Sequence, residues 1–331
     1  MKVCIYLEGE EFPRTGIGTA YRNHKRALER AGVNITTDPS EDYNLLHLCW
    51  YGPKSSYHFS KAIREGKKTV AHVLGIGHKD SYTFSKLFPP ITKRLVKYFC
   101  IRSDLVVVPT PYTKELLSDY GIDEKIQVIS NGVDRRRFYF SERKRHQYRK
   151  QFGLKRTTIF SVGQVIPRKG IADFLKVAEA FPEFNFIWYG PQWGKLLSFY
   201  PEMYRQIKEK PPNVQFVGFV DDIQATYAAG DIFFFPSYDE LQGIVLLESA
   251  SVGVPIIIRD LPAYEGWLEH EQNCLKGGSQ AEFIAHIERL AGDEALQRRL
   301  IEGGDQLAEA HSLERIGEQL KETYEGLLNQ D

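Results

Sequence analysis

The chain has 331 residues, of which 42% are apolar and 26% are charged, and it carries no formal net charge at neutral pH. This composition is typical of a soluble globular protein with room for two domains. No apolar run approaches the ~20 residues that a transmembrane helix needs, and the N-terminus lacks the pattern of a signal peptide. The four cysteines are scattered without a C-x-x-C pair, which argues against a zinc site or a disulfide framework. We therefore expect a cytoplasmic protein that lies at most on a membrane surface.

The charge is unevenly distributed along the chain. Residues 1–156 hold 29 Lys and Arg against 16 Asp and Glu, whereas the remainder holds 14 against 27. Such an asymmetry concerns partners more than fold. The basic half would attract nucleic acid, an anionic membrane or an acidic substrate. Alternatively, the two halves are domains with complementary surfaces.

Short apolar strands alternate with helical patterns through the first half. Strands are predicted at 3–7, 44–49, 68–73, 104–109 and 125–130, and a helix at 19–31. The run Leu105–Val108 is typical of a parallel strand that is buried on both faces. A basic helix over 143–156 is expected to lead into a linker between two domains.

The second half repeats this alternation. Strands are predicted at 158–162, 185–189, 214–218, 232–235 and 255–258, with helices at 171–181, 200–209, 222–229 and 244–251. A polar helical tail follows from residue 281. Strands that alternate with helices predict parallel sheets with right-handed crossovers, and hence two Rossmann-like units.

A glycine-rich segment follows the predicted strand 158–162, at the end where doubly wound sheets bind ligands. It reads Gly163-Gln-Val-Ile-Pro-Arg168-Lys169-Gly170 and precedes a predicted helix. Two cations at a helix N-terminus favour phosphate, because their charge adds to that of the free backbone N–H groups. The alternative is a solvated turn without a ligand.

A second candidate element is the acidic pair Glu240 and Glu248. It follows Pro236-Ser237 and precedes Gly253-Val-Pro255. Eight residues span about 12 Å in a helix, so the two carboxylates cannot share a proton as a close catalytic pair does. They are suited to holding two parts of one elongated, hydroxyl-rich ligand. The alternative is a buried strand followed by a helix with two solvated glutamates.

Together these segments resemble the E-x7-E signature and the G-x-x-x-x-[RK]-K-G loop of retaining GT-B glycosyltransferases of family 4. The turn Asn131-Gly-Val-Asp134 also matches that family. The resemblance implies an α/β protein with the GT-B fold, in which two Rossmann-like, doubly wound domains face a central cleft. It implies an N-terminal acceptor-binding domain over 1–154, to which a last helix at 313–331 crosses back, and a nucleotide-sugar-binding domain over 155–312.

The resemblance also implies roles for individual residues. Lys169, together with Arg168, would neutralise the leaving nucleotide diphosphate. Glu248 would bind the ribose hydroxyls, and Glu240 would lie near the transferred sugar. Backbone groups would complete the nucleotide-sugar site at Gly163, Gly16, Val217, Leu241, Gln242, Gly243 and Ile244.

A histidine is expected near the donor sugar in this family. His72, at the end of the predicted strand 68–73, is the candidate for this catalytic role, and His78 is its rival. The alternative is that His72 is structural.

The chain departs from the family pattern at two positions. Gln164 stands where many members have arginine, so that one diphosphate contact is either absent or left to Arg168. Leu241 stands where E-G-x-G would have its first glycine. These departures support an alternative in which the chain is a catalytically silent nucleotide-sugar-binding or membrane-associated protein.

The mechanism that the resemblance implies is metal-independent hexosyl transfer with retention, by attack on the face from which the diphosphate leaves. Lys169 and Arg168 would stabilise that diphosphate, and no cofactor is expected. Glu240 as a covalent nucleophile is the alternative. Asp221-Asp222 offers the one D-x-D-like pattern, but it is better suited to cap a helix than to bind a metal.

The acceptor is predicted from a basic and aromatic segment between residues 79 and 102. Its cations include Lys86, Lys93, Arg94 and Lys97, which alternate with apolar and aromatic residues. This pattern is typical of a helix at a membrane interface, and the basic clusters at 135–137 and 143–145 would add attraction to anionic lipid. The alternative is an ordinary amphipathic helix packed on the sheet, and no nucleic-acid-binding motif is present.

The basic first half and the glycine loops further resemble bacterial glycosyl-diacylglycerol glycosyltransferases. This resemblance implies UDP-glucose or UDP-galactose as donor, a glycolipid such as monoglucosyl-diacylglycerol as acceptor, and a peripheral position on the inner face of the cell membrane. The same chemistry on a soluble or cell-surface glycan is the alternative.

Overall fold

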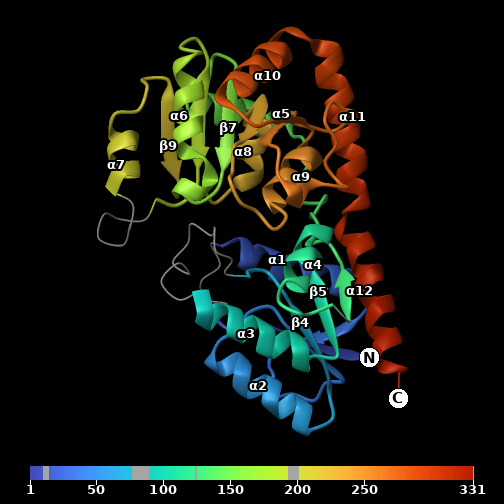
Figure 1. Cartoon of the computed structure of the whole chain (residues 1–331). Coiled ribbons are helices and arrows are strands. Elements are labelled where there is room, and N and C mark those ends of the chain that lie inside the picture. The colour runs from blue at the N-terminus through green and yellow to red at the C-terminus, as the bar shows by residue number, and fades with distance from the viewer. Residues whose placement is uncertain (10–14, 77–88, 124, 193–200, 331) are drawn as a thin grey trace. The chain divides into compact units, whose positions relative to one another are not determined.

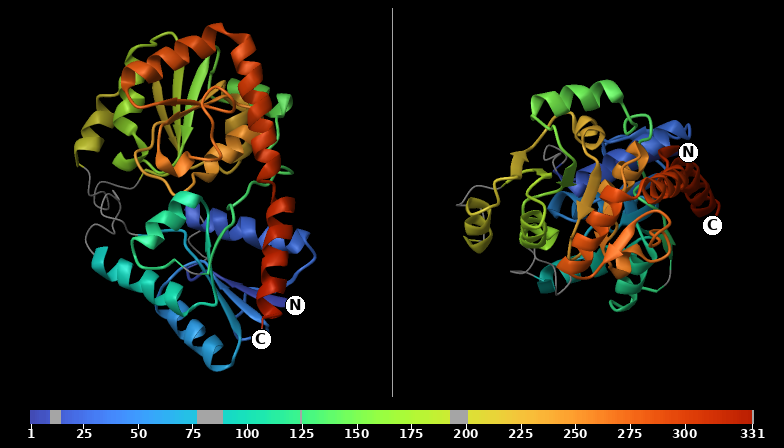
Figure 2. Two further views of the ribbon diagram at one scale, coloured as in Figure 1. Left: turned by 45° about the vertical axis from the view of Figure 1, so that its right-hand side comes forward. Right: turned by 90° about the horizontal axis from the view of Figure 1, so that it is seen from above.

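The computed structural model describes residues 1–9, 15–76, 89–123, 125–192 and 201–330, and only the backbone of 89–92. The chain forms two compact units. Unit 1 comprises Met1–Asp134, Leu241–Ile244 and Ala310–Asp331, and unit 2 comprises Arg135–Glu240 and Val245–Glu309. Each unit contains one six-stranded parallel sheet with helices on both faces (Figures 1 and 2).

The sheet of unit 1 has the strand order β2-β1-β3-β4-β5-β6. Val3 and Ile5 of β1 pack with α1 and α12 on one face, whereas Cys4 packs toward α2 and α3 on the other, because successive side chains of a strand point to opposite faces. This is the predicted doubly wound arrangement. The strands are β1 (Lys2–Tyr6), β2 (Asn34–Thr36), β3 (Leu45–Leu48), β4 (Lys68–His72), β5 (Leu105–Val108) and β6 (Ile126–Val128), and the helices are α1 (Gly16–Arg30), α2 (Pro53–Arg64), α3 (Pro89–Arg102), α4 (Pro111–Ser118) and α12 (Leu313–Leu328).

The last helix, α12, is part of unit 1 and packs along α1. Its buried face contains Leu313, Ile316, Leu320 and Tyr324. The two helices approach so closely at Gly317 that a Cβ there would lie 2.2 Å from the carbonyl oxygen of Ala27. The C-terminal tail therefore joins unit 1 by packing its helix on α1, and it adds no strand to the sheet.

The sheet of unit 2 has the order β12-β11-β10-β7-β8-β9. Its core combines aliphatic with aromatic side chains, among the latter Phe174, Phe186, Trp188 and Phe234. The strands are β7 (Thr158–Val162), β8 (Asn185–Tyr189), β9 (Val214–Gly218), β10 (Ile232–Phe235), β11 (Ile256–Arg259) and β12 (Leu275–Gly277). The helices are α5 (Glu142–Gln151), α6 (Ile171–Glu179), α7 (Pro201–Lys208), α8 (Ile223–Ala229), α9 (Ile244–Val252), α10 (Gln280–Gly292) and α11 (Glu294–Ala310), with the 3₁₀ turns η2 (Pro167–Lys169) and η3 (Pro262–Tyr264).

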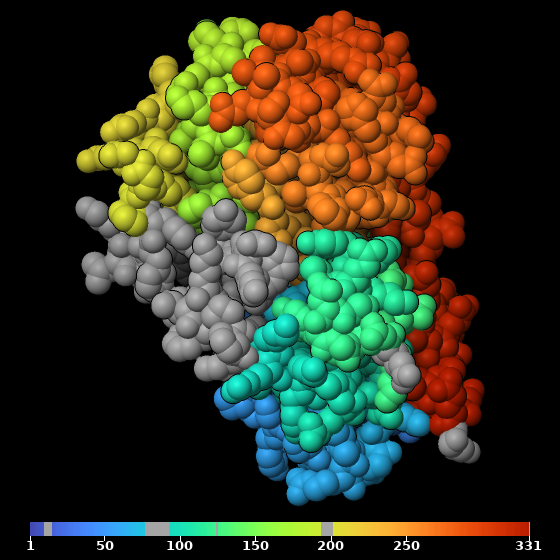
Figure 3. Space-filling model, in the orientation of Figure 1, coloured from blue at the N-terminus to red at the C-terminus, as the bar shows by residue number. Residues whose placement is uncertain are grey.

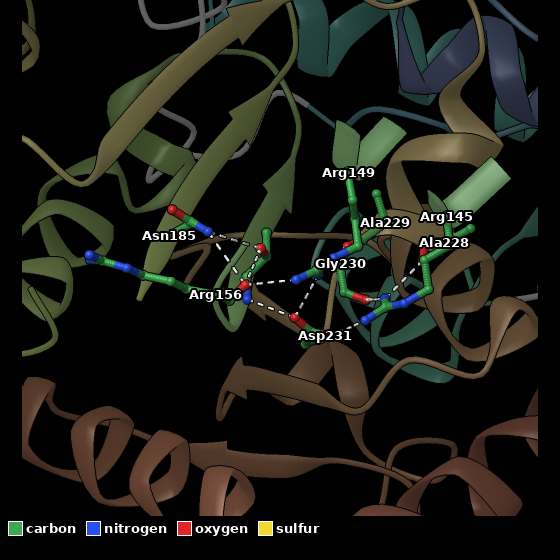
Figure 4. A network of polar contacts seen from close by, with 9 residues as sticks. Arg145, Arg149, Arg156, Asn185, Ala228, Ala229, Gly230 and Asp231 are labelled. Carbon is green, nitrogen blue, oxygen red and sulfur yellow. Dashed lines mark hydrogen bonds and ion pairs between the residues drawn. The ribbon is translucent and has the colours of Figure 1, made fainter. Parts of the chain in front are cut away.

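The basic helix α5 belongs to unit 2, although we expected a domain boundary after it, at residue 154. Arg145 donates to the carbonyl oxygens of Ala228 and Gly230 at the end of α8 (3.0 and 2.8 Å), and it also pairs with Asp231 (Figure 4). Arg149 lies 3.0 Å from the same carboxylate. Cations suit a helix C-terminus because its last carbonyl groups carry partial negative charge. These contacts attach α5 to unit 2, and the division of the chain falls after Asp134.

This division removes the charge asymmetry that the halves of the sequence show. Unit 1 contains 21 Lys and Arg against 20 Asp and Glu, and unit 2 contains 22 against 23. The reason is that residues 135–156, which are strongly basic, lie in unit 2, while the acidic helix α12 lies in unit 1. The expectation of a basic N-terminal domain therefore does not hold for unit 1 as a whole.

Candidate active site

The segment between β7 and α6 holds Arg168 and Lys169. The chain forms η2 and enters α6 through Gly170, whose φ is +78° and whose Cβ would lie 2.2 Å from the carbonyl oxygen of Pro236. Only glycine fits such a position. No side chain caps the first N–H groups of α6, and uncapped N–H groups at a helix start attract anions. The predicted cationic turn therefore does lie at a helix N-terminus.

Glu240 lies against this turn within unit 2. Its Oε1 atom forms ion pairs with Lys169 and, at 3.4 Å, with Arg168, and it accepts a hydrogen bond of 2.8 Å from Ser237 Oγ. Arg168 also donates to the carbonyl oxygen of Asp239. Glu240 is only 8% exposed. The structure thus brings together three residues that the sequence indicated as catalytic, from segments about 70 positions apart.

The charges of this cluster influence one another. Burial lowers the pKa of Lys169, although the adjacent Glu240 carboxylate opposes that shift. Burial alone would raise the pKa of Glu240, but the charges of Lys169 and Arg168 and the hydrogen bonds to the carboxylate outweigh it, so the pKa of Glu240 is lowered. Glu240 is therefore ionised at neutral pH and accepts hydrogen bonds. A carboxyl group that acts as a general acid would instead need a raised pKa.

The second glutamate, Glu248, lies on α9 and is also buried. Tyr227 of α8 donates a hydrogen bond of 2.7 Å to Glu248 Oε2. Burial, and then the charge of Glu248, raise the pKa of Tyr227 far above its usual range, so its hydroxyl remains a donor. Tyr227 was not predicted from the sequence, because nothing in its local pattern indicates that α8 faces the acidic residue of α9.

The residues that follow Glu240, Leu241–Ile244, make their contacts in unit 1. Thr110 Oγ1 donates to the carbonyl oxygen of Leu241 (2.8 Å), and the Leu241 side chain packs on the core beside α2 and α3. Among the described residues other than glycine, only Lys125 and Glu271 have a positive φ. Leu241 therefore lies in a backbone conformation open to any residue, and the glycine usual at this position is not needed here.

The chain matches two family models and several known proteins. The model of the glycosyl transferases group 1 matches residues 142–307, and the model of glycosyltransferase family 4 matches residues 19–137. The processive diacylglycerol alpha-glucosyltransferase of Acholeplasma laidlawii is 33% identical, over 99% of each chain. The alpha-galactosylglucosyldiacylglycerol synthase of Streptococcus pneumoniae is also 33% identical, over 84% of this chain and 77% of that protein.

The chain belongs to the family 4, group 1 glycosyltransferases. Its fold is GT-B, since the structure of Anabaena HepE in complex with UDP-glucose superposes with a TM-score of 0.82 over 98% of this chain and all of that one, at 18% identity. The resemblance that the motifs predicted is confirmed, and so is the α/β fold with two doubly wound units.

Three further residues of the predicted nucleotide-sugar site lie at strand or helix ends of this glycosyltransferase. Gly163 follows β7, where its N–H donates to Tyr189 O at 2.9 Å. Val217 is partly buried near the end of β9. Gly16 is the exposed first residue of α1, and a Cβ there would meet no atom within 4 Å. Packing therefore does not explain why glycine occurs at position 16.

His72 lies in unit 1, at the end of β4, and is fully buried. Its ring stacks on His24 with centroids 4.4 Å apart and planes 13° apart, and His47 meets both rings edge-on. Ring nitrogens of the three histidines lie within 4.8 Å of one another, yet the in-plane lone pairs of two stacked rings do not converge on one ion. The surroundings of His72 fit the structural alternative, and its catalytic role stays a prediction. The rival, His78, lies outside the described residues.

The predicted acceptor residues lie partly on α3. Lys93, Arg94 and Lys97 are exposed, whereas Lys86 lies outside the described residues. Val96, Phe99 and Cys100 of this helix are buried in the core of unit 1, whereas Ile101 is 52% exposed. The buried apolar face of α3 therefore packs on the sheet, as in the alternative of an ordinary amphipathic helix, while Lys93, Arg94 and Lys97 remain available to a partner.

The other two basic clusters, 135–137 and 143–145, each have cations that form ion pairs within unit 2. Arg135 pairs with Asp305 at 2.6 Å and with Glu309 at 3.5 Å, and Lys144 pairs with Asp222 at 2.8 Å. Asp222 also caps α8, as its side chain accepts from Ala225 N. In the part of the chain that the structure describes, no helix is both long and apolar enough to span a bilayer.

Proposed function

We propose that this glycosyltransferase is a retaining, metal-independent hexosyltransferase that moves a hexose from UDP-glucose or UDP-galactose to a membrane glycolipid such as monoglucosyl-diacylglycerol. The observation that carries the proposal is the cluster of Lys169, Arg168 and Glu240 at the start of α6, followed by the buried Glu248. In this proposal the cluster holds the diphosphate and the sugar, and Glu248 holds the ribose.

The chemistry follows from the charges of the cluster. As the bond between the anomeric carbon and the phosphate oxygen breaks, negative charge grows on the diphosphate. Lys169 and Arg168 are preorganised beside uncapped N–H groups of α6 and would stabilise that charge without rearrangement. The departing phosphate would accept the proton of the acceptor hydroxyl. Glu240 is already paired with both cations, which supports a role in orienting them and the sugar rather than one as nucleophile.

Retention and the glycolipid acceptor are supported by the names of the relatives. Both relatives form alpha-linked glycosyl-diacylglycerol products according to those names. UDP-hexoses of the gluco and galacto series carry the sugar in the α configuration, so an α-linked product from this chain would mean retention. A peripheral position on the inner face of the cell membrane follows from the proposed acceptor, and the exposed cations of α3 are the candidate contact with anionic lipid.

Two alternatives differ from this proposal in what they predict. The same chemistry on a soluble or cell-surface glycan predicts transfer that is independent of vesicles. A catalytically silent protein predicts binding of the nucleotide sugar without turnover. The intact cluster of Glu240 with both cations supports an active enzyme.

The proposal is tested with radiolabelled UDP-glucose, UDP-galactose and GDP-mannose, offered with anionic vesicles that contain diacylglycerol or monoglucosyl-diacylglycerol. We expect labelled lipid from one UDP-hexose, unchanged activity with excess EDTA, and an α-anomeric proton in the NMR spectrum of the product. A β-linked product would contradict retention, and hydrolysis of the donor without any labelled lipid would contradict the lipid acceptor. Binding of the donor without any product would favour the silent protein.

A further inference from the structure

The side chain of Gln242 is buried, and both ends of its amide are paired inside unit 1. Its Oε1 atom accepts a hydrogen bond of 3.0 Å from the backbone N–H of Asn131, and its Nε2 atom donates one of 2.6 Å to Ser130 Oγ. The residue is only 2% exposed. Gln242 is therefore held at two points to the turn that follows β6.

That turn is fixed by other parts of unit 1. His24 Nε2 donates to the carbonyl oxygen of Ser130 at 3.0 Å, and Asn23 Nδ2 donates to that of Gly132 at 2.7 Å. The N–H of Val133 donates to the carbonyl oxygen of His311 at 2.9 Å. The turn is held by α1 and by the segment before α12. We therefore infer that the turn fixes the position of Gln242, and that Gln242 does not fix the turn.

The backbone N–H groups of Leu241–Ile244 stand out in this setting. None of them donates a hydrogen bond to another described residue. Gly243 has a φ of +81°, which only glycine adopts easily and which redirects the chain at the start of α9. Successive unpaired N–H groups at such a turn form a concavity that attracts anions. A loop that is fixed in one conformation holds its unpaired donors at the positions that a ligand requires.

We propose that Gln242 is a positioning residue for donor binding: its amide fixes the Leu241–Ile244 loop so that the unpaired N–H groups meet the β-phosphate and hexose of the nucleotide sugar. The inference rests on the proposed function, and it concerns the Gln242 side chain, which the sequence analysis did not consider. It predicts a defect limited to the diphosphate and sugar part of the donor, because the nucleoside is bound elsewhere, by Glu248.

The test uses Gln242→Met, which keeps the length of the side chain and removes both polar ends. Gln127→Met, at an exposed position of β6 in the same unit, is the matched control. Isothermal titration measures the Kd of UDP-glucose, or of UDP-galactose if that is the donor, and of UMP, which lacks the β-phosphate and the hexose. We expect Gln242→Met to raise the Kd and the KM for the nucleotide sugar about tenfold. The Kd for UMP should stay within about twofold of wild type.

Ser130→Ala provides a second variant if Gln242→Met folds poorly. It removes one partner of the amide and is expected to raise the Kd for the nucleotide sugar about threefold, again with UMP unaffected. In the double variant, the two effects should be less than additive, since both act through one contact. Ser130→Thr, which retains the hydroxyl, should bind like wild type.

Equal weakening of nucleotide sugar and UMP would mean a general structural role and would overturn the inference. So would a Gln242→Met protein that binds the nucleotide sugar like Gln127→Met, and in both cases transfer by the wild type would leave the proposed function standing. If the wild type itself bound no nucleotide sugar, the proposed function would have failed first, and the inference with it.

Discussion

Lys169 shows how a single side chain depends on several features of the fold. It lies between the carboxylate of Glu240 and the ring of Phe235, whose centroid is 4.9 Å from Nζ. Burial lowers its pKa, and the ion pair opposes this shift and keeps the ammonium charged. The same charge would be available to a diphosphate, so the residue connects the stability of the turn with the proposed chemistry.

Replacement of Lys169 by methionine tests its proposed role in hexose transfer. We expect kcat for hexose transfer to fall by about 10²–10³, the usual effect of removing one group that stabilises charge in the transition state. Lys176→Met, on the exposed face of α6, is the control and should retain wild-type kcat. Steady-state kinetics with radiolabelled donor provide the measurement, and an active Lys169→Met enzyme would remove this residue from the mechanism.

The buried histidines of unit 1 predict a loss of stability in acid. Burial lowers the pKa of His24 from 6.5 to about 4, and it also lowers the pKa values of His47 and His72 well below 6.5. Above pH 6.5 these side chains are neutral in the folded and the unfolded chain. As the pH falls from 6.5 toward 4, the unfolded chain binds protons that the folded chain does not, so the free energy of unfolding decreases by up to about 1.4 kcal/mol per pH unit for each histidine.

Urea denaturation between pH 7.5 and pH 4.5 measures this effect. The midpoint should decrease steeply below pH 6.5 for the wild type and less steeply for His72→Leu, which removes one titrating group. His146→Leu, at an exposed position of α5, should follow the wild-type slope. Parallel curves for wild type and His72→Leu would show that the cluster does not titrate as its burial predicts.

At the scale of elements, the sequence predicted the central strands better than the edges of the sheets, and it missed α2 (Pro53–Arg64). The edge strands β2 and β12 have three residues each and were not expected, because so short a segment shows no recognisable periodicity. The Pro-Arg-Lys turn was expected as a loop but forms the 3₁₀ turn η2. The assignment of α5 to unit 2 depends on arginine contacts with α8 that the helix pattern itself does not reveal.

The contact of α12 with α1 predicts opposite effects of alanine at two glycines of the same helix. A Cβ at Gly317 would overlap the carbonyl oxygen of Ala27, whereas at Gly326 it would meet no atom within 4 Å. Gly317→Ala should therefore destabilise unit 1 by about 1–3 kcal/mol through overpacking. Gly326→Ala should stabilise it by up to about 1 kcal/mol, because alanine favours the helix. Thermal and urea unfolding provide the measurement, and equal effects at the two positions would contradict the close helix contact.

At the scale of the whole molecule, the charge of the chain must be assigned by unit and not by half of the sequence. Unit 1 is almost neutral, so any attraction to an anionic membrane has to come from a local surface. The exposed Lys93, Arg94 and Lys97 of α3 form the candidate surface, and α2 and α3 appear in blue and teal on the face that Figure 3 presents.

Replacement of all three α3 cations by glutamine should weaken binding to anionic vesicles about 100-fold, since each cation near such a surface contributes about 1 kcal/mol. The matched control replaces Lys176, Arg205 and Arg298, three exposed cations of unit 2. Vesicle sedimentation at low and high salt is the measurement. Sedimentation that neither salt nor the α3 substitutions alter would rule out this surface as the electrostatic contact.

The sequence alone determined the family and the alternation of strands and helices, and it predicted Glu240, Glu248, Arg168 and Lys169 as site residues, because each of these signals lies within a short segment of defined spacing. Tertiary structure alone decided which partners these residues have and which unit each charged segment joins. Tyr227 with Glu248, Ser130 with Gln242 and Arg145 with Asp231 are pairs formed by residues distant in the chain. Their contacts depend on how the elements pack, and local periodicity carries no information on that packing.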